Sequence, residues 1–290
     1  MQLEELSLDE ITISNLLLLP LESCVRLKKL SVAESCLEDL TELHGCGRLM
    51  TQLQELKVCG NEVESLEGLQ AFSQLKAFSI GGGGRTSSLD PVAACVHLER
   101  LDIGWCWNVS DFEPLSTCAN LKELTMTDCS SLSSLSPLSA CCRLEVLNIN
   151  TTDVDADFEQ TVDLVGLEGL QACTQLRRLD MSNRENVSSL APLSACVKLQ
   201  QLNMAGCSSV SSLFPLAACI DLNDLDMSRC TSLSSVAPLA ACAQLKTLNM
   251  RGCSGFVSVE PLKACVQLEV LKIQPGQEAL KAALPRLRVD

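Results

Sequence analysis

A 23-residue pattern, repeated along almost the whole chain, constrains the fold more than any other feature of the sequence. One copy runs from Leu121 to Arg143 and reads LKELTMTDCSSLSSLSPLSACCR, and Leu144 begins the pattern again. The second leucine-type position recurs twelve times, at intervals of 22 to 26 residues apart from one interval of 32. Units at so regular a spacing predict a solenoid, in which each unit packs on its neighbours. The recurring positions are Leu6, Leu30, Leu56, Phe78, Leu101, Leu124, Leu147, Leu179, Leu202, Leu225, Leu248 and Leu271.

The first part of each unit, L-x-x-L-x-M, predicts a short β-strand because apolar and polar residues alternate in it. In the ninth unit we expect Leu199, Leu202 and Met204 to face the core, and Gln201 and Asn203 to face outward. One such strand cannot bury its apolar side alone, so the strands are expected to stack into a parallel sheet along the inner surface. Twelve strands at roughly 4.8 Å each give a sheet about 55 Å long.

The second part, V/L-S-S-L-x-P-L-x-x-C, predicts the return of the chain to the next strand. Apolar residues three apart indicate a 3₁₀-like turn or a short extended segment. The recurring proline has no amide hydrogen, which is harmless where no sheet partner waits. In two units the proline motif is replaced by Leu-Glu-Gly-Leu, at residues 66–69 and 167–170.

These motifs resemble the leucine-rich repeat over almost the whole chain. The L-x-P-L and L-E-G-L returns are similar to the short repeats of internalins and of the regulatory subunit of protein phosphatase 1. The 23-residue period, with cysteine in place of the usual asparagine and with V-S-S-L-x-P-L, resembles trypanosomatid leucine-rich repeat proteins more closely. The resemblance implies an α/β-type but mostly β, right-handed curved solenoid with a parallel inner sheet and 3₁₀ or extended returns. Such a scaffold does not fix its ligand, because ligands are read by variable positions.

The domain organisation follows from the repeat. We expect one domain over residues 1–290 with about twelve units, because a solenoid grows lengthwise. Residues 151–164 form an acidic insertion in this pattern, and residues 276–285 predict a short capping helix after a Pro-Gly break. No polar cap precedes Leu3, and residues 11–21 are unusually apolar. We therefore expect a partner or a missing segment to cover the N-terminal end.

The eighteen cysteines fall mostly into two columns of the repeat, which indicates buried thiols that fill the core. With no signal peptide, reduced thiols favour an intracellular, cytoplasmic protein. A metal or redox centre is the alternative, but no C-x-x-C spacing occurs, and the nearest grouping is His44 with Cys36 and Cys46. The return column contains Cys24, Cys46, Cys95, Cys118, Cys141, Cys173, Cys196, Cys219, Cys242 and Cys265, and the turn column contains Cys106, Cys129, Cys207, Cys230 and Cys253.

Several classes of function are disfavoured. A formal charge of −14 argues against nucleic acid as a partner and for basic partners if they are charged. No run of 18 apolar residues indicates a membrane span. His44 and His97 lie in different units, so no catalytic group is expected and no cofactor is predicted. The run Gly81–Gly84 lacks the lysine of a phosphate-binding loop, and the insertion lacks the glycine of a calcium loop.

The candidate binding residues are the exposed aromatic residues and the polar residues of the inner surface. Tryptophan is a frequent interface anchor, and a solenoid offers a long preformed surface. The alternative is that the polar residues only pair across strands, as Arg100 would with Glu123. The candidates are Trp105, Trp107, Phe158, Arg100, Asp102, Arg178, Asp180, Asn203 and Asp226.

We therefore predict a non-enzymatic protein–protein interaction scaffold, as a structural or adaptor subunit of a larger intracellular assembly. The taxonomic resemblance adds cytoskeletal or flagellar assemblies as an association. The resemblance to the phosphatase subunit implies the first alternative, a regulatory adaptor of an enzyme such as a protein phosphatase or a cyclase. The second alternative is a metal or redox protein that uses the thiols.

Overall fold

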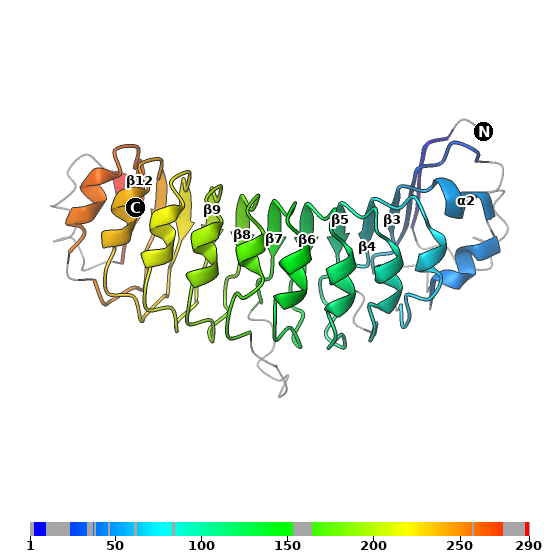
Figure 1. Cartoon of the computed structure of the whole chain (residues 1–290), viewed down its shortest axis with the longest axis horizontal. Coiled ribbons are helices and arrows are strands. Elements are labelled where there is room, and N and C mark those ends of the chain that lie inside the picture. Colours follow the sequence, from blue (N-terminus) through cyan, green and yellow to red (C-terminus); the bar gives the residue numbers. More distant parts are fainter. Residues whose placement is uncertain are drawn as a thin grey trace. The chain divides into compact units, whose positions relative to one another are not determined.

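A computed structural model describes residues 3–9, 24–33, 37, 39–45, 47–60, 63–82, 85–152, 164–256, 258–274 and 288–289. The chain divides into two compact units, Met1–Leu132 and Ser133–Asp290, called here the N-terminal and C-terminal units. Each is described by itself. In each unit Figure 1 shows strands side by side, with short helical turns on one side of them. The single domain over residues 1–290 stays a prediction.

The strands of the N-terminal unit form a parallel sheet in the order of the sequence. The pairing aligns Leu6 with Leu30, Leu30 with Leu56, and Leu101 with Leu124. Positions that recur in the sequence are therefore neighbours in space, which confirms the predicted parallel stacking. The strands are β1 (Glu5–Asp9), β2 (Lys29–Ala33), β3 (Glu55–Lys57), β4 (Ala77–Ser79), β5 (Arg100–Asp102) and β6 (Glu123–Thr125).

The C-terminal unit repeats this arrangement. Leu147 aligns with Leu179, across the long interval of 32 residues, and Leu202 aligns with Leu225. The strands are β7 (Val146–Asn148), β8 (Arg178–Asp180), β9 (Gln201–Asn203), β10 (Asp224–Asp226), β11 (Thr247–Asn249), β12 (Val270–Lys272) and β13 (Arg288–Val289). Strand β13 pairs in parallel with β12. It lies beyond the last copy of the repeat, so periodicity did not predict it.

The return segments contain 3₁₀ helices, as predicted. In the unit of Leu121, the amide of Leu138 donates to the carbonyl of Leu135 at 2.9 Å, and the amide of Cys141 donates to that of Leu138 at 2.9 Å. Proline occupies one of the first two helical positions, where its missing hydrogen is not needed. These helices are η3 (Leu69–Ala71), η4 (Asp90–Ala94), η5 (Glu113–Thr117), η6 (Ser136–Ala140), η7 (Leu170–Ala172), η8 (Ala191–Ala195), η9 (Phe214–Ala218), η10 (Ala237–Ala241) and η11 (Glu260–Ala264).

Three returns depart from the proline pattern for visible reasons. In η3 and η7 the residue before the helix is Gly68 or Gly169, with φ of 97° and 111°. A Cβ atom on Gly169 would lie 2.1 Å from the carbonyl oxygen of Leu135, so only glycine fits there. Early in the chain, the extra residues between Cys46 and Leu53 form a short α-helix, α2 (Gly47–Gln52), which follows η2 (Leu40–Gly45).

The core consists of the same few positions from each repeat. Leu199, Leu202 and Met204 are buried while Gln201 and Asn203 are partly exposed, which confirms the predicted alternation. The unit of Leu121 adds the return positions to the core, and its buried residues are Leu121, Leu124, Met126, Cys129, Leu132, Leu135, Leu138 and Cys141. At about 25 cal/mol per Å² of apolar surface, this stack is the main stabilising contribution.

Three predictions fall on residues that the structure does not describe. They are the covered N-terminal end at residues 11–21, the acidic insertion beyond Thr152 with Phe158, and the capping helix at residues 276–285. Cys36 and Cys46 also lie outside the described residues, as does the side chain of His44.

Candidate interaction surfaces

Each unit exposes one face of its sheet, built from the side chains that alternate with the buried ones. We call these the N-terminal and C-terminal sheet faces. The N-terminal sheet face contains Lys29, Ser31, Glu55, Lys57, Ala77, Ser79, Arg100, Asp102, Glu123 and Thr125. The C-terminal sheet face contains Val146, Asn148, Arg178, Asp180, Gln201, Asn203, Asp224, Asp226, Thr247, Asn249, Val270 and Lys272.

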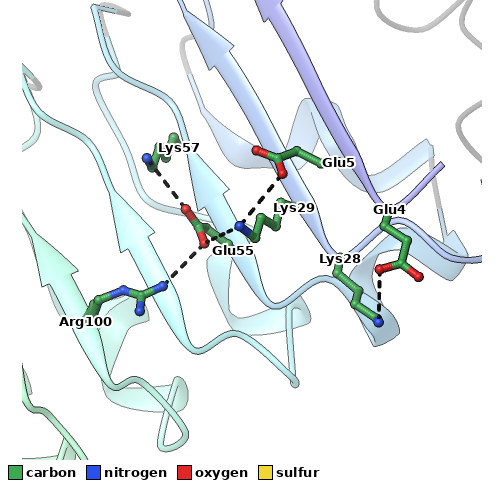
Figure 2. A network of polar contacts seen from close by, with 7 residues as sticks. All are labelled: Glu4, Glu5, Lys28, Lys29, Glu55, Lys57 and Arg100. Carbon is green, nitrogen blue, oxygen red and sulfur yellow. Dashed lines mark hydrogen bonds and ion pairs between the residues drawn. The ribbon is translucent and has the colours of Figure 1, made fainter.

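A half-buried carboxylate organises the N-terminal sheet face (Figure 2). The Glu55 side chain, 18% exposed, lies 3.3 Å from Arg100, 3.6 Å from Lys57 and 3.9 Å from Lys29. Lys29 also lies 3.8 Å from Glu5 on β1. The cationic side chains are about half exposed, so each ion pair contributes a few tenths of a kcal/mol at most. The network therefore fixes the positions of the charges more than it stabilises the fold.

The expected pairing of Arg100 with Glu123 is wrong. Arg100 instead reaches Glu55, two strands away, as Figure 2 shows. The strand between them carries only Ala77 at this height, and its small side chain leaves the path open. Glu55 is also surrounded by several cations and is less exposed, so its charge is less screened.

Asp102 lies at the end of β5, where its carboxylate accepts two hydrogen bonds. Oδ2 accepts from the Ser79 hydroxyl at 3.0 Å, and Oδ1 accepts from the Gly104 amide at 3.1 Å. The second bond closes a turn of the type that aspartate favours. Asp102 is thereby held at the edge of the sheet where the strands end.

The C-terminal sheet face brings three predicted residues together. Asp180 accepts from Asn203 Nδ2 at 3.1 Å, and Asp226 accepts from Asn249 Nδ2 at 2.8 Å. Each of these side chains also accepts the amide hydrogen of the residue two places later; for Asp180 that residue is Ser182, at 3.0 Å. The resulting polar ladder is held rigid by its own hydrogen bonds, so cross-strand pairing accounts for much of its chemistry.

An open hollow of about 480 Å³ lies over this ladder. It is lined by residues of the strands from β7, with Val146, to β12, with Lys272. Arg178 and Asp224 line it from the column beside the ladder. Partial burial and the charge of Asp226 raise the pKa of Asp224, while Lys272 opposes this shift. The C-terminal sheet face therefore offers carboxylates, amides and cations within one preformed surface.

The two tryptophans lie in the turn after β5, on either side of buried Cys106. Trp105 is 39% exposed and Trp107 is 37% exposed. Trp105 has a φ of 65°, in the left-handed region. Other units have glycine at the corresponding place, as at Gly82 and Gly206. A non-glycine residue there costs about 1–2 kcal/mol. Sequence reasoning found the tryptophans but missed this strain, which the glycines of the same column signal.

The thiols of the buried cysteines form hydrogen bonds that link successive repeats. In the turn column, the Cys230 thiol donates to the carbonyl of Met204 at 3.1 Å, and the Cys253 thiol donates to that of Met227 at 2.9 Å. In the return column, Cys196 donates to Leu170 at 3.4 Å. Each acceptor belongs to the preceding unit. The burial of these thiols matches their predicted role as residues that fill the core.

Burial makes these thiols poor nucleophiles. It raises the pKa of Cys95, Cys173, Cys207 and Cys219 to about 12, and the neighbouring thiols add to the shift for most of them. Burial likewise raises the pKa of Cys196, Cys242, Cys253 and Cys265 to about 11. The thiolate is the reactive form, so these side chains are inert near neutral pH. Cys142 is exposed.

One buried polar residue escaped the sequence reasoning. Arg184 occupies the turn column, where most units have cysteine, and it is only 6% exposed. Its Nε donates to the carbonyl of Ile149 at 2.6 Å, which is the bond that a cysteine makes elsewhere. The signal was the 23-residue spacing from Arg184 to Cys207. It was overlooked because the insertion interrupts the pattern just before it.

Among the described residues, no three histidine, cysteine or acidic side chains lie close enough together to hold a metal ion. His97 is exposed, as predicted. No helix within the described ranges is long and apolar enough to cross a membrane.

The geometry agrees with known proteins at the level of the fold. No family model matches the sequence, and no curated protein matches it. The structure is similar to an internalin (inlF) of Listeria monocytogenes, with a TM-score of 0.73 and 16% identity over 92% of this chain and 81% of that one. It is also similar to internalin C2 (inlC2) of Listeria monocytogenes, with a TM-score of 0.54 and 21% identity over 65% of this chain and 76% of that one.

The stacked parallel strands and 3₁₀ returns define a mostly β leucine-rich repeat solenoid. This confirms the predicted fold class. Solenoid repeats in general present extended surfaces that can bind other molecules. The identities are too low to transfer a partner.

Proposed function

We propose that this chain is a non-enzymatic scaffold that binds a protein partner through its C-terminal sheet face. The observation that carries the proposal is the ladder of Asp180, Asn203, Asp226 and Asn249, whose side chains are fixed by hydrogen bonds beneath an open hollow. A rigid polar surface loses little conformational entropy when a partner binds.

We further propose that the protein is a structural or adaptor subunit of an intracellular assembly. Support comes from the buried thiols, which remain reduced in a reducing compartment. Cytoskeletal or flagellar assemblies are the first place to look, on the strength of the repeat's resemblance to trypanosomatid proteins. Trp105 and Trp107 are proposed as a second contact, at the edge of the N-terminal unit.

The test is partner capture with two charge reversals. Arg178→Glu alters the C-terminal sheet face, whereas Lys263→Glu alters η11 on the return side and changes the net charge equally. Each tagged variant is incubated with lysate, and bound proteins are identified by crosslinking and mass spectrometry. We expect the partner of the wild-type chain to be lost with Arg178→Glu and kept with Lys263→Glu. The reverse result, or a wild-type chain that binds no protein, would contradict the proposal.

A further inference from the structure

We infer that the turn edge of the N-terminal unit, formed by Trp105 and Trp107 with Asp102 and Asp128, binds a basic segment of the partner that presents arginine. This inference rests on the proposed function, because it takes the chain to be a protein-binding scaffold and names the chemistry of one contact. It adds a specific class of partner to that function.

Trp105 has a backbone conformation that is unfavourable for an aromatic residue. In several repeats, the residue three places after the end of the strand adopts a positive φ. Four of these repeats have glycine at that position, namely Gly60, Gly82, Gly206 and Gly252. The remaining described examples are Asp128, Asn183 and Arg229. An aromatic side chain at such a position is unfavourable for the fold. Strain of this kind is characteristic of functional sites.

Glycines occupy the start of the turn beside Trp105. Gly82 donates its amide hydrogen to the carbonyl of Gly104 at 3.2 Å, so the turn of Gly81 and Gly82 lies directly beside that of Trp105. Neither glycine has a side chain that could cover the ring. Trp105 is 39% exposed beside these two glycines.

Two carboxylates, those of Asp102 and Asp128, belong to the segments around Trp105. On the other side of Trp105, its amide donates to the carbonyl of Thr127 at 2.7 Å, which places Asp128 alongside it. Asp102 is fixed beside Gly104 by its hydrogen bonds to Ser79 and to the Gly104 amide. Arg100, which lies on the same strand as Asp102, is directed toward Glu55 (Figure 2).

An exposed aromatic ring with carboxylates on neighbouring residues favours binding of a cation. A guanidinium group stacks on a tryptophan face through cation–π attraction, and its planar fork matches a carboxylate. A chain with a net charge of −14 also attracts basic partners at long range. A neutral or acidic segment would gain neither interaction.

The sequence provides its own reporter and its own control substitutions. Trp105 and Trp107 are the only tryptophans, so intrinsic fluorescence reports on this edge alone. Trp105→Gly installs the residue that four other units use, and the charge stays unchanged. Asp102→Asn and Asp128→Asn likewise install residues found at equivalent positions, as at Asn203 and Asn183. The double variant Asp90→Asn/Asp221→Asn removes two exposed carboxylates in or next to the return helices η4 and η9, and it serves as the charge-matched control.

The probe is a peptide of alternating arginine and glycine with blocked ends, compared with the same peptide containing neutral citrulline in place of arginine. We expect the arginine peptide to change the tryptophan emission of the full chain, and the effect to weaken with added salt. Anisotropy of the labelled peptide should show at least tenfold weaker binding to Trp105→Gly. The Asp102→Asn/Asp128→Asn variant should bind several-fold more weakly, and Asp90→Asn/Asp221→Asn within twofold of wild type.

The melting temperature separates this role from a structural one. We expect Trp105→Gly to melt at or above the wild-type temperature, because the glycine relieves strain while binding is lost. If that variant does not fold, the Trp107→Phe and aspartate variants still decide the matter. Equal binding of the citrulline peptide, unchanged emission, or full binding by Trp105→Gly would overturn the inference. Partner capture that still depends on Arg178 would then leave the scaffold function standing without a basic contact here.

Discussion

Alkaline pH should unfold this protein unusually early, because its core is filled with thiols. In the folded chain, burial raises the pKa of Cys196, Cys242 and Cys265 to about 11, whereas a thiol in an unfolded chain titrates near about 8.5. A raised folded-state pKa means that the thiol's contribution to stability is fully present below about pH 8.5. It is lost progressively as the pH rises toward about 11–12.

The magnitude follows from linkage. One pH unit above its unfolded pKa, each buried thiol lowers the free energy of unfolding by about 1.4 kcal/mol. About ten such thiols together lower it by about 14 kcal/mol, which is the entire stability of a typical domain at about 5–15 kcal/mol. The chain has no tyrosine, and lysine side chains in general titrate only near about pH 10.4, so the cysteines are the side chains that titrate from about pH 8.5 upward. The loss is therefore assigned to the thiols.

The assay is urea unfolding followed by circular dichroism, from pH 7 to pH 10.5 with a thiol-free reductant. We expect a flat stability up to about pH 8 and a steep fall above about pH 8.5, with thiolate absorbance appearing in step with unfolding. Cys142→Ser, which removes an exposed thiol, should leave the slope unchanged. A stability that stays constant to pH 10.5 would refute the assignment of buried, protonated thiols to the core.

Four further substitutions test the packing and the ion-pair network. Gly169→Ala should destabilise the fold by more than about 2 kcal/mol, measured by thermal melting, because its Cβ would clash with the Leu135 carbonyl; a neutral effect would contradict that geometry. Arg184→Cys should match or exceed wild-type stability in urea, because it restores the thiol that other repeats have at this position. Arg184→Ala should lower the free energy of unfolding by about 1–3 kcal/mol, because the Ile149 carbonyl loses its hydrogen bond. Glu55→Gln should change the melting temperature little, because its cationic partners are exposed, and a loss above about 1 kcal/mol would show that this network stabilises the fold.

Periodicity predicted what depends on the average unit. The aligned leucines, the strands and the 3₁₀ returns are properties of every copy, so the spacing alone places Leu101 beside Leu124. The buried thiols follow from the same reasoning, because a residue type that recurs in one column meets the same environment each time.

Features of single units were missed because periodicity averages over them. The pairing of Arg100 with Glu55 depends on the small size of Ala77, which alternation does not weigh. The left-handed conformation of Trp105 is visible only when its column is compared with the glycines of other units. Strand β13 pairs with β12 without belonging to a full repeat, so the repeat could not indicate it.

Chemical modification of the thiols shows whether the stacked repeats enclose the cysteines as protonated core residues. The native protein is treated with a thiol reagent at neutral pH, and the modified cysteines are identified by mass spectrometry before and after unfolding. We predict that the fourteen cysteines buried in the described part of the chain remain unmodified in the folded protein while exposed Cys142 reacts, and that all eighteen react once the chain is unfolded. Rapid modification of Cys207, Cys230 and Cys253 in the folded protein would contradict it.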